Sequence, residues 1–295
     1  MWRMLLQSWI QQQAREKVYE SVRRAADSQV KTPADEPLSP PPPADVGLVF
    51  ALGVESGGLI DLLDGVLTTP TPRFTVRQGG CRGRSVVLIE SGMGCILAAQ
   101  ATEMLIAAHH PPWIISAGFA GAVNACMQRG DLVLVNYAAD MHGNGLAIDV
   151  RMSPEELKKH PGLHVGRVIT ADKIVRTREE KLALGEQFQS LALDMETYAV
   201  AEVCRQHKVK FLALRVISDT VDDELPVDIE NLARQRTVAA QLGAAASAIW
   251  KRPSSVKQMW QLKEAAIVGS DRLAKFLVGM IPQLAPERKK IPETT

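Results

Sequence analysis

From Val46 onward the chain repeats one pattern, in which a short and almost uninterrupted apolar run is followed by a segment with helical periodicity. The apolar runs are GLVFAL, SVVLIES, PWIISAG, DLVLVNY, GRVITA and FLALRVIS. Runs of this kind are typical of strands buried on both faces, and the helical segments suit crossover connections. The pattern therefore predicts an α/β fold of three layers, in which helices cover a central, mostly parallel sheet.

One segment, RFTVRQGGCRGRSVVLIE, departs from this pattern because it contains two strand-like runs without a helix between them. The runs are joined around Gly79, Gly80 and Gly83, which predicts a hairpin and makes the sheet mixed. An Ala-rich helix at about residues 229–250 is expected to end the domain. The α/β domain is thus expected to span residues 46–251.

Both ends of the chain differ from this domain. Residues 1–30 carry an apolar stripe (Trp2, Leu5, Leu6, Trp9 and Ile10) at helical spacing, which predicts an amphipathic helix. This stripe suits docking on the protein's own core or on a partner subunit, and its two Trp residues also suit a peripheral membrane contact. Residues 31–45 are rich in proline and predict an extended linker. Residues 252–295 hold two amphipathic stretches, VKQMWQLKEAA and DRLAKFLVGMI, which predict an added helical extension.

The composition limits the classes of partner and the compartment expected for the chain. With 34 Lys and Arg against 33 Asp and Glu, no global basic field exists to collect nucleic acid, which favours a small-molecule partner. The four cysteines form no CxxC pair and the six histidines form no metal-like cluster, so we expect neither a metal nor another cofactor. A reducing compartment, and hence a cytoplasmic location, is expected because no cleavable leader or bilayer-spanning apolar stretch is evident.

Chemically active side chains follow several of the predicted strands. In open α/β sheets ligands bind at the carboxyl ends of strands, so these positions are the first candidates for a site. Glu55, Ser91 and Asp219 each follow an apolar run. Glycines in SGMG and in GFAGA allow a backbone to approach a ligand, although the geometry of a strand-to-helix turn also accounts for each of them. The acids of DMET and of ISDT have a similar alternative as helix caps.

Three blocks, GFAGAV, DMETYAVAEVC and RVISDTVDD, occur in this order along the chain. Together they resemble the nucleoside phosphorylase and nucleosidase superfamily, in particular the methylthioadenosine/S-adenosylhomocysteine nucleosidases, over about residues 46–250. The resemblance implies cleavage of the N-glycosidic bond of a purine nucleoside, by preference a 5'-modified adenine nucleoside. It also implies a homodimer. Residues 1–45 and 252–295 lie outside the resemblance.

The resemblance assigns roles to the catalytic candidates. Asp219 would protonate N7 of the departing purine, which requires an apolar, partly dry pocket that raises its pKa, and Ser218 would orient it. Glu55 stands where nucleosidases have the acid that positions or deprotonates the attacking water. Arg215 matches a family arginine near that end of the site, and an ion pair with Glu55 or Glu196 is its structural alternative.

Other candidates are assigned to substrate binding. By the same resemblance Glu196 would accept hydrogen bonds from the ribose hydroxyls and Met195 would lie against the sugar. The backbone at Ile174 and Val175 would read the edge of adenine. The remaining candidates lie in the glycine-containing turns after the strands and are Ser91, Gly92, Gly118 and Phe119.

Two features depart from the nucleosidase pattern, and two alternative functions stay open. Phe119 replaces a small hydroxyl residue, and the loop in NYAADMHGNGLAIDV is shortened. The Glu55 carboxylate would repel phosphate, which favours water as the nucleophile. The DMETYAVAEVC and ISDTVDDELP segments are nevertheless also similar to the hopanoid-associated phosphorylases, in which case Ser91, the SGMG backbone and Arg82 or Arg84 would hold phosphate and the nucleoside would carry a lipid tail. A catalytically silent nucleoside-binding protein is the second alternative.

Overall fold

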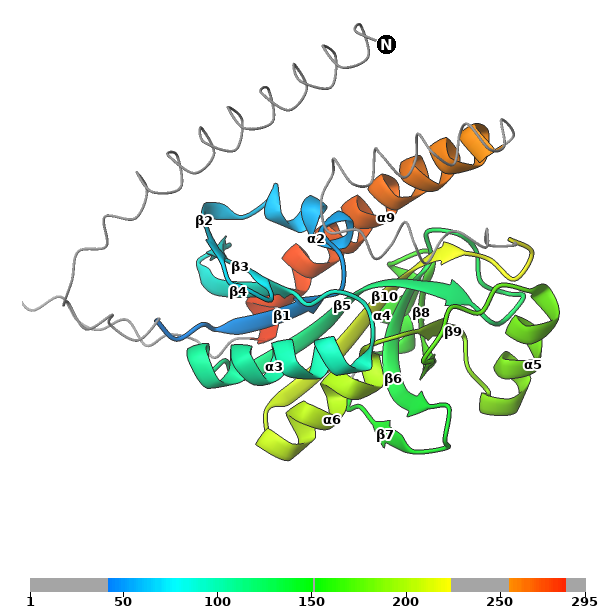
Figure 1. Cartoon of the computed structure of the whole chain (residues 1–295), viewed down its shortest axis with the longest axis horizontal. Helices are drawn as coiled ribbons and strands as arrows, with labels where there is room; N and C mark the ends of the chain where they lie inside the picture. Colours follow the sequence, from blue (N-terminus) through cyan, green and yellow to red (C-terminus); the bar gives the residue numbers. More distant parts are fainter. Residues whose placement is uncertain (1–41, 151, 224–254, 285–295) are drawn as a thin grey trace, which may run out of the picture. The chain divides into compact units, whose positions relative to one another are not determined.

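The apolar runs form one ten-stranded sheet in the computed structural model, which describes residues 42–150, 152–223 and 255–284 (Figure 1). The helices predicted at residues 1–30 and 229–250, and most of the proline-rich linker, lie outside the described residues. The strands are β1 Val46–Phe50, β2 Asp64–Pro70, β3 Thr75–Cys81, β4 Arg84–Glu90, β5 Trp113–Ala122, β6 Leu132–Asp140, β7 Gly145–Ala147, β8 Leu163–Thr170, β9 Ala192–Asp194 and β10 Lys210–Asp219.

The sheet is mixed, as the sequence predicts, and part of it closes on itself. Its strand order is β10-β6-β8-β9-β5-β1-β4-β3-β2, with β7 beside β6 and a further pairing between β10 and β5. Strands β5, β9, β8, β6 and β10 therefore form a closed ring, from which the other strands extend. Of the ten pairings in the described residues, five are parallel and five antiparallel, so antiparallel pairs are more numerous than the apolar runs indicated.

Helices cover both faces of the sheet, which confirms the predicted α/β layers. The helices are α2 Gly53–Ile60, α3 Cys95–His109, α4 Pro154–Lys158, α5 Arg178–Phe188, α6 Thr197–His207 and α9 Ser255–Leu284. In Figure 1, α2 and α9 lie together on one side of β1 and β5, and α3 and α6 on the other. Each pair packs its own apolar cluster, one around Leu59, Leu273 and Leu277 and the other around Leu105 and Val200.

The predicted hairpin is present as β3 and β4, and its turn is formed by Arg82 and Gly83. Both residues have positive φ, 48° and 79°, which suits a two-residue hairpin turn, whereas Gly79 and Gly80 belong to strand β3. Strand β2 precedes this hairpin and pairs with β3 at the edge of the sheet. The sequence pattern did not indicate β2, because all seven of its residues are exposed and no buried face marks it.

The C-terminal extension is one continuous helix whose second half belongs to the core. Leu273, Leu277 and Ile281 recur every four residues, and each is fully buried. Burial of a side chain of this size contributes about 1.5–3 kcal/mol, so the three together anchor α9 firmly. The helix expected after the α/β domain is therefore present at Ser255–Leu284, and its second half packs into the domain core. Among the described residues, no helix has the length and apolar character needed to cross a bilayer.

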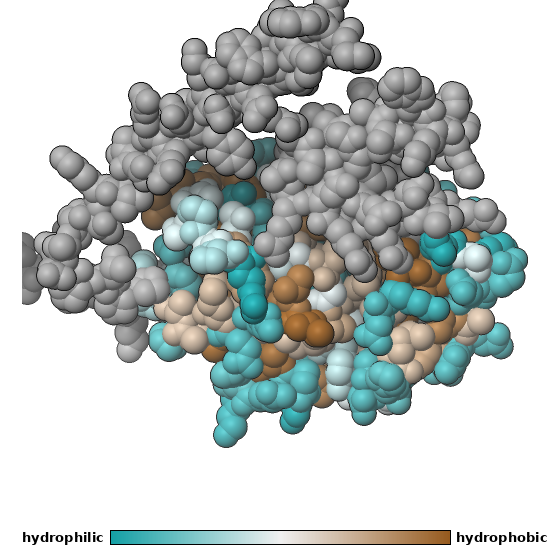
Figure 2. Space-filling model, in the orientation of Figure 1, coloured by the Kyte–Doolittle hydropathy of each residue, from teal (hydrophilic) through white to brown (hydrophobic). Residues whose placement is uncertain are grey.

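The surface of the described residues mixes both classes of side chain (Figure 2). The lower part of that view, toward α6 and β7, is mostly hydrophilic, and apolar side chains show closer to the centre. Residues Ala44 and Asp45, which the sequence places in the linker, already hydrogen-bond to His109 and Ser85 of the domain.

Candidate active site

Glu55 lies in the first turn of α2 with its carboxylate turned back toward the end of β1. One carboxylate oxygen accepts hydrogen bonds from the backbone N–H groups of Ala51 and Leu52, at 2.9 and 2.8 Å. The other accepts one from Phe119 N, at 2.8 Å. A carboxylate with three backbone donors is held in one position, and the side chain is only 5% exposed.

Gly118 on β5 leaves the space that this carboxylate occupies. A Cβ atom at Gly118 would lie 2.7 Å from Glu55 Oε1, which no real contact tolerates. The glycine of the GFAGAV block is therefore needed for close approach of the acid to the strand. Phe119, expected to contact substrate, here contributes its backbone N–H to Glu55 and packs its ring toward α9 near Gly269.

Glu196 lies beside the turn that follows β4. Its Oε1 accepts a hydrogen bond of 2.7 Å from Gly94 N, in a turn where Gly92 and Gly94 have positive φ. Ser91, at the start of this turn, is buried and its hydroxyl donates to the carbonyl groups of Phe50 and Gly92. The turn thus joins the ends of β1 and β4 to the DMET segment.

Arg215 is the buried cation of this region, and its partner is Asp194. Its Nε donates to Asp194 Oδ2 at 2.7 Å, and its Nη2 donates to Ser116 Oγ at 2.7 Å. The ion pair expected with Glu55 or Glu196 is not the one that forms, because Asp194 reaches the guanidinium from β9. Arg215 acts on the two glutamates through its charge alone.

Burial sets the protonation of both glutamates. Desolvation raises the pKa of Glu55, and the backbone donors and Arg215 oppose this rise. Desolvation together with the charges of Asp194 and Glu55 raises the pKa of Glu196 to about 8. Glu196 is therefore able to accept and release a proton near neutral pH, and burial also moves the pKa of Glu55 upward from its ordinary value.

Asp219 ends β10 after an irregularity in its pairing with β5. The register shifts between Ile217 and Asp219, and such a bulge redirects the side chain that follows it. A Cβ atom at Gly121 would lie 3.0 Å from Asp219 Oδ2, so this second glycine of β5 makes room for the second acid. Ser218 Oγ lies 2.7 Å from Asp219 Oδ1, a geometry that fixes the plane of the carboxylate.

The surroundings of Asp219 differ from the apolar pocket that its proposed role requires. The side chain is buried, but Lys181 Nζ of α5 lies 2.7 Å from its Oδ2. Lys181 is only 2% exposed. The carboxylate is therefore half of a buried ion pair.

The predicted catalytic residues fall into two groups along β5. Glu55, Glu196, Arg215 and Gly118 line one small cavity, which Asp219 does not line. Gly118 and Gly121 are three residues apart, about 10 Å along a strand. This spacing places the Glu55 group and Asp219 at separate points of the same sheet edge.

The remaining candidates lie around these two groups. Met195 precedes Glu196, and its carbonyl accepts a hydrogen bond from Cys95 Sγ. Ile174 and Val175 lie in the irregular loop between β8 and α5, where Val175 packs on Leu193 of β9. This loop is thereby attached to the strand that leads into DMET.

Sequence reasoning missed Lys181, gave Asp194 only a capping alternative and did not consider Ser116. Lys181 shares the inward face of α5 with Gly185 and Phe188, at i+4 and i+7, and this position of a lysine was the available signal. Asp194 does accept hydrogen bonds from the start of α6, at Thr197, in addition to its ion pair.

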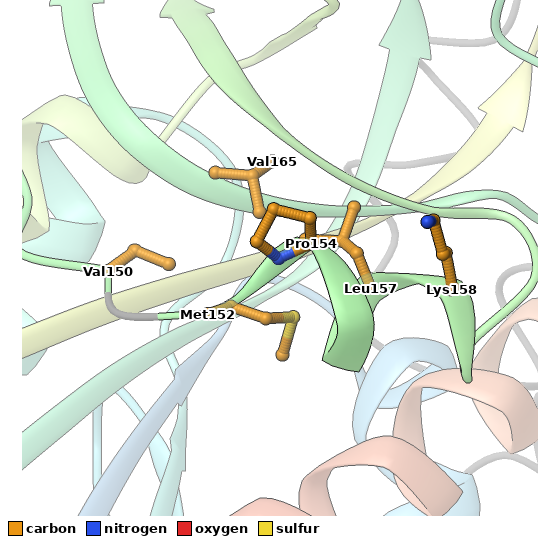
Figure 3. Close-up of a pocket in the computed structure, with 6 residues that line it drawn as sticks. All are labelled: Val150, Met152, Pro154, Leu157, Lys158 and Val165. Atoms are coloured by element: carbon orange, nitrogen blue, oxygen red, sulfur yellow. The ribbon is translucent and has the colours of Figure 1, made fainter.

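A second cavity lies elsewhere and contains none of the predicted residues. It measures about 470 Å³ and lies beside α4 and the first half of β8 (Figure 3). Its lining is Val150, Met152, Pro154, Leu157, Lys158 and Val165. The site at the strand ends is thus distinguished by its chemistry rather than by its volume. Within residues 42–150, 152–223 and 255–284, no group of three His, Cys, Asp or Glu side chains is suited to a metal ion.

Comparison with known proteins gives one family. The family model of the phosphorylase superfamily matches residues 45–250. The 5'-methylthioadenosine/S-adenosylhomocysteine nucleosidase of Staphylococcus haemolyticus (strain JCSC1435) is 25% identical over 206 residues, which cover 63% of this chain and 90% of that protein.

Solved structures share the fold. The 5'-methylthioadenosine/S-adenosylhomocysteine nucleosidase of S. pneumoniae, with a transition-state inhibitor bound, superposes with a TM-score of 0.60 at 19% identity, over 80% of this chain and 97% of that one. The futalosine hydrolase of Helicobacter pylori strain 26695 superposes with a TM-score of 0.59 at 18% identity, over 81% and 97%.

Proposed function

Because this chain belongs to the phosphorylase superfamily, we propose that it cleaves a purine nucleoside and that the nucleophile is water. The observation that carries the choice of water is the position of Glu55. The three backbone N–H groups that could bind an anion at the end of β1 and β5 already bind this carboxylate. A phosphate ion there would meet a negative charge instead of free donors.

Hydrolysis divides the work between the two groups of the site. Glu55 accepts the proton of the water that attacks the sugar carbon C1', and its raised pKa suits a base. Glu196 accepts hydrogen bonds from the ribose hydroxyls, while Arg215 balances the charge of the acids. Asp219 delivers a proton to the purine as the C1'–N9 bond breaks, because the departing base gains the electron pair of that bond.

The arginines that a phosphorolytic site would use are distant from the SGMG turn. Arg82 and Arg84 lie at one end of β4, and Ser91 follows its other end, about 20 Å along a seven-residue strand. Arg77 is closer to this turn, but it forms an ion pair with Glu90. Arg73 also lies close to this turn, and its Nη1 donates a hydrogen bond to Gln100 Oε1, so both nearer arginines contact other side chains of the domain.

The substrate class is a 5'-modified adenine nucleoside. The loop carrying Ile174 and Val175 offers backbone groups for the base, in line with the family pattern. Val54 and Ile96 are 43% and 74% exposed and lie at the second positions of α2 and α3. Two apolar side chains beside the sugar group of the site suit an apolar 5' substituent.

The first experiment is adenine release from methylthioadenosine, S-adenosylhomocysteine and futalosine, each with and without phosphate, with the sugar product identified by mass. Release of free sugar without phosphate is expected. Glu55→Gln should abolish release, whereas Asp61→Asn, at an exposed position that ends the same helix, should not. Release that requires phosphate and yields a sugar phosphate would replace this proposal with phosphorolysis. Binding without cleavage would identify a nucleoside sensor.

The assembly and location of the protein stay predictions from the sequence. We expect a homodimer in light scattering and a cytoplasmic location in fractionation. Deletion of residues 1–30 should abolish liposome binding without loss of cleavage if this segment contacts membranes. Absence of liposome binding by the full-length protein would dismiss that contact.

A further inference from the structure

We propose that Lys181 is a positioning residue that supplies, through Asp219, the proton for the leaving base. This inference rests on the proposed nucleosidase activity and adds a residue outside the matched sequence blocks. Its basis is the geometry of a single ammonium group buried between α5 and the end of β10.

The three donors of Lys181 all have acceptors. Its Nζ lies 2.7 Å from Asp219 Oδ2, 2.8 Å from Thr220 O and 2.9 Å from Asp223 O. An ammonium has three N–H groups, so no donor is left for water or for another acid. One of the three N–H groups of Lys181 therefore points at Asp219, the proposed general acid.

The charges around the pair identify Asp219 as the counter-ion of Lys181. The other acids of the following turn have cations of their own: Asp222 pairs with Arg178 and Asp223 with Arg129. A buried ammonium without an anionic partner is strongly unfavourable. The resting pair is thus ammonium and carboxylate, with Ser218 Oγ bound to the second carboxylate oxygen. In this state the carboxylate itself carries no proton to give.

The proton must then come from Lys181, and the reaction balances on this basis. As the C1'–N9 bond breaks and its electron pair moves into the purine, Asp219 Oδ2 takes a proton from Lys181, which becomes a neutral amine, and passes that proton to N7. Water adds to C1' and loses its proton to Glu55. The proton gained by Glu55 equals the one lost by Lys181, and its return through solvent restores both groups.

A purely structural role would have a different signature. Lys181 also fixes the turn 220–223, so its loss could disturb the site without any part in proton transfer. The structural role and the role in proton transfer can be distinguished by changing the leaving group of the substrate. Adenine departs far more readily when protonated, whereas 4-nitrophenolate departs as a stable anion and needs no proton. A proton source matters only for the first.

The test is the turnover number of Lys181→Met on methylthioadenosine and on the 4-nitrophenyl glycoside of the same sugar. Turnover of the nucleoside should fall by about 10²- to 10⁴-fold, as for loss of general-acid catalysis, and that of the nitrophenyl glycoside by no more than a few fold. Asp219→Asn should show the same selective loss. Arg178→Met is the matched control. It removes the ion pair between α5 and Asp222 in the same turn, and Arg178 has no contact with Asp219.

Equal losses on both substrates in Lys181→Met would overturn the inference and leave Lys181 a structural anchor. If this variant does not fold, Lys181→Gln, which keeps neutral donors but holds no ionic proton, replaces it and is read in the same way. A wild-type protein that cleaves neither substrate would instead reject the proposed function, so the two failures are distinct.

Discussion

Gly118→Ala is expected to move the Glu55 carboxylate without changing the residue itself, and so to test whether its position matters for catalysis. The new Cβ atom would lie 2.7 Å from Oε1 and 3.2 Å from Oε2 of an acid that remains chemically unchanged. Glu55 cannot yield freely, because Ala51, Leu52 and Phe119 all donate backbone hydrogen bonds to it.

The magnitude follows from the distances. Relief to an ordinary contact of roughly 3.5 Å from the present 2.7 Å moves the carboxylate by about 0.8 Å, away from Phe119 N at 2.8 Å. The lost hydrogen bond to a charged group costs about 1.5–3 kcal/mol. A catalytic group displaced by about 1 Å costs on the order of 10²-fold in turnover.

The assay is the turnover number for adenine release, measured with the pH profile and the melting temperature. Since the Phe119 N–H lowers the pKa of Glu55, its loss raises that pKa, and the acidic limb of activity should move to higher pH. Gly57→Ala is the control: it lies in the same helix, its Cβ meets nothing within 4 Å, and it should gain about 0.5–1 kcal/mol of stability with unchanged turnover. Wild-type turnover in Gly118→Ala would refute the role of Glu55 at this position.

Three further predictions address other parts of the site. Gly121→Ala crowds Asp219 instead, and should slow cleavage of methylthioadenosine while sparing the 4-nitrophenyl glycoside, as read by steady-state kinetics on both. The pKa of Glu196, raised to about 8, means that its favourable contribution to folding is complete below about pH 4.5 and is lost as the pH rises through 8. Glu196→Gln should therefore flatten the decline of unfolding free energy between pH 5 and 9 in denaturant titrations, and Glu202→Gln, whose pKa is lowered to about 2, should not. Ser270→Ala removes the hydroxyl that joins α9 to α2, and should cost about 1 kcal/mol in the same titrations with KM unchanged.

The sequence could predict the strands and the acids at their ends because both depend on local pattern. A buried parallel strand needs an apolar run, and the residue after that run lies at the ligand-binding edge whatever the rest of the chain does. Glu55, Ser91 and Asp219 follow this rule. Strand β2 could not be found in this way because all of its residues are exposed, and β9 because it is only three residues long.

The partners of the buried charges could not be predicted, because they are set by tertiary contacts. Lys181 and Asp219 are 38 residues apart, and Arg215 and Asp194 are 21 apart. No spacing rule links such pairs, and the closed ring of strands that brings them together follows from pairing between β5 and β10 rather than from any single segment. The apolar stripe of α9 predicted its helix, but the stripe does not name the surface on which the helix packs, because that surface is set by tertiary contacts.

The arrangement of the two acid groups predicts where specificity can change. Glu55 and Asp219 are each accommodated by a glycine of β5, so a buried strand fixes the spacing between the two acids. In the proposed function the 5' end of the substrate lies against Ile96, whose side chain is 74% exposed. Ile96→Thr should therefore alter the ratio of kcat/KM between methylthioadenosine and S-adenosylhomocysteine while leaving kcat for each nearly unchanged. If kcat itself fell in parallel for both substrates, the 5' end would not be separate from the catalytic groups, and the assignment of Ile96 to that end would be wrong.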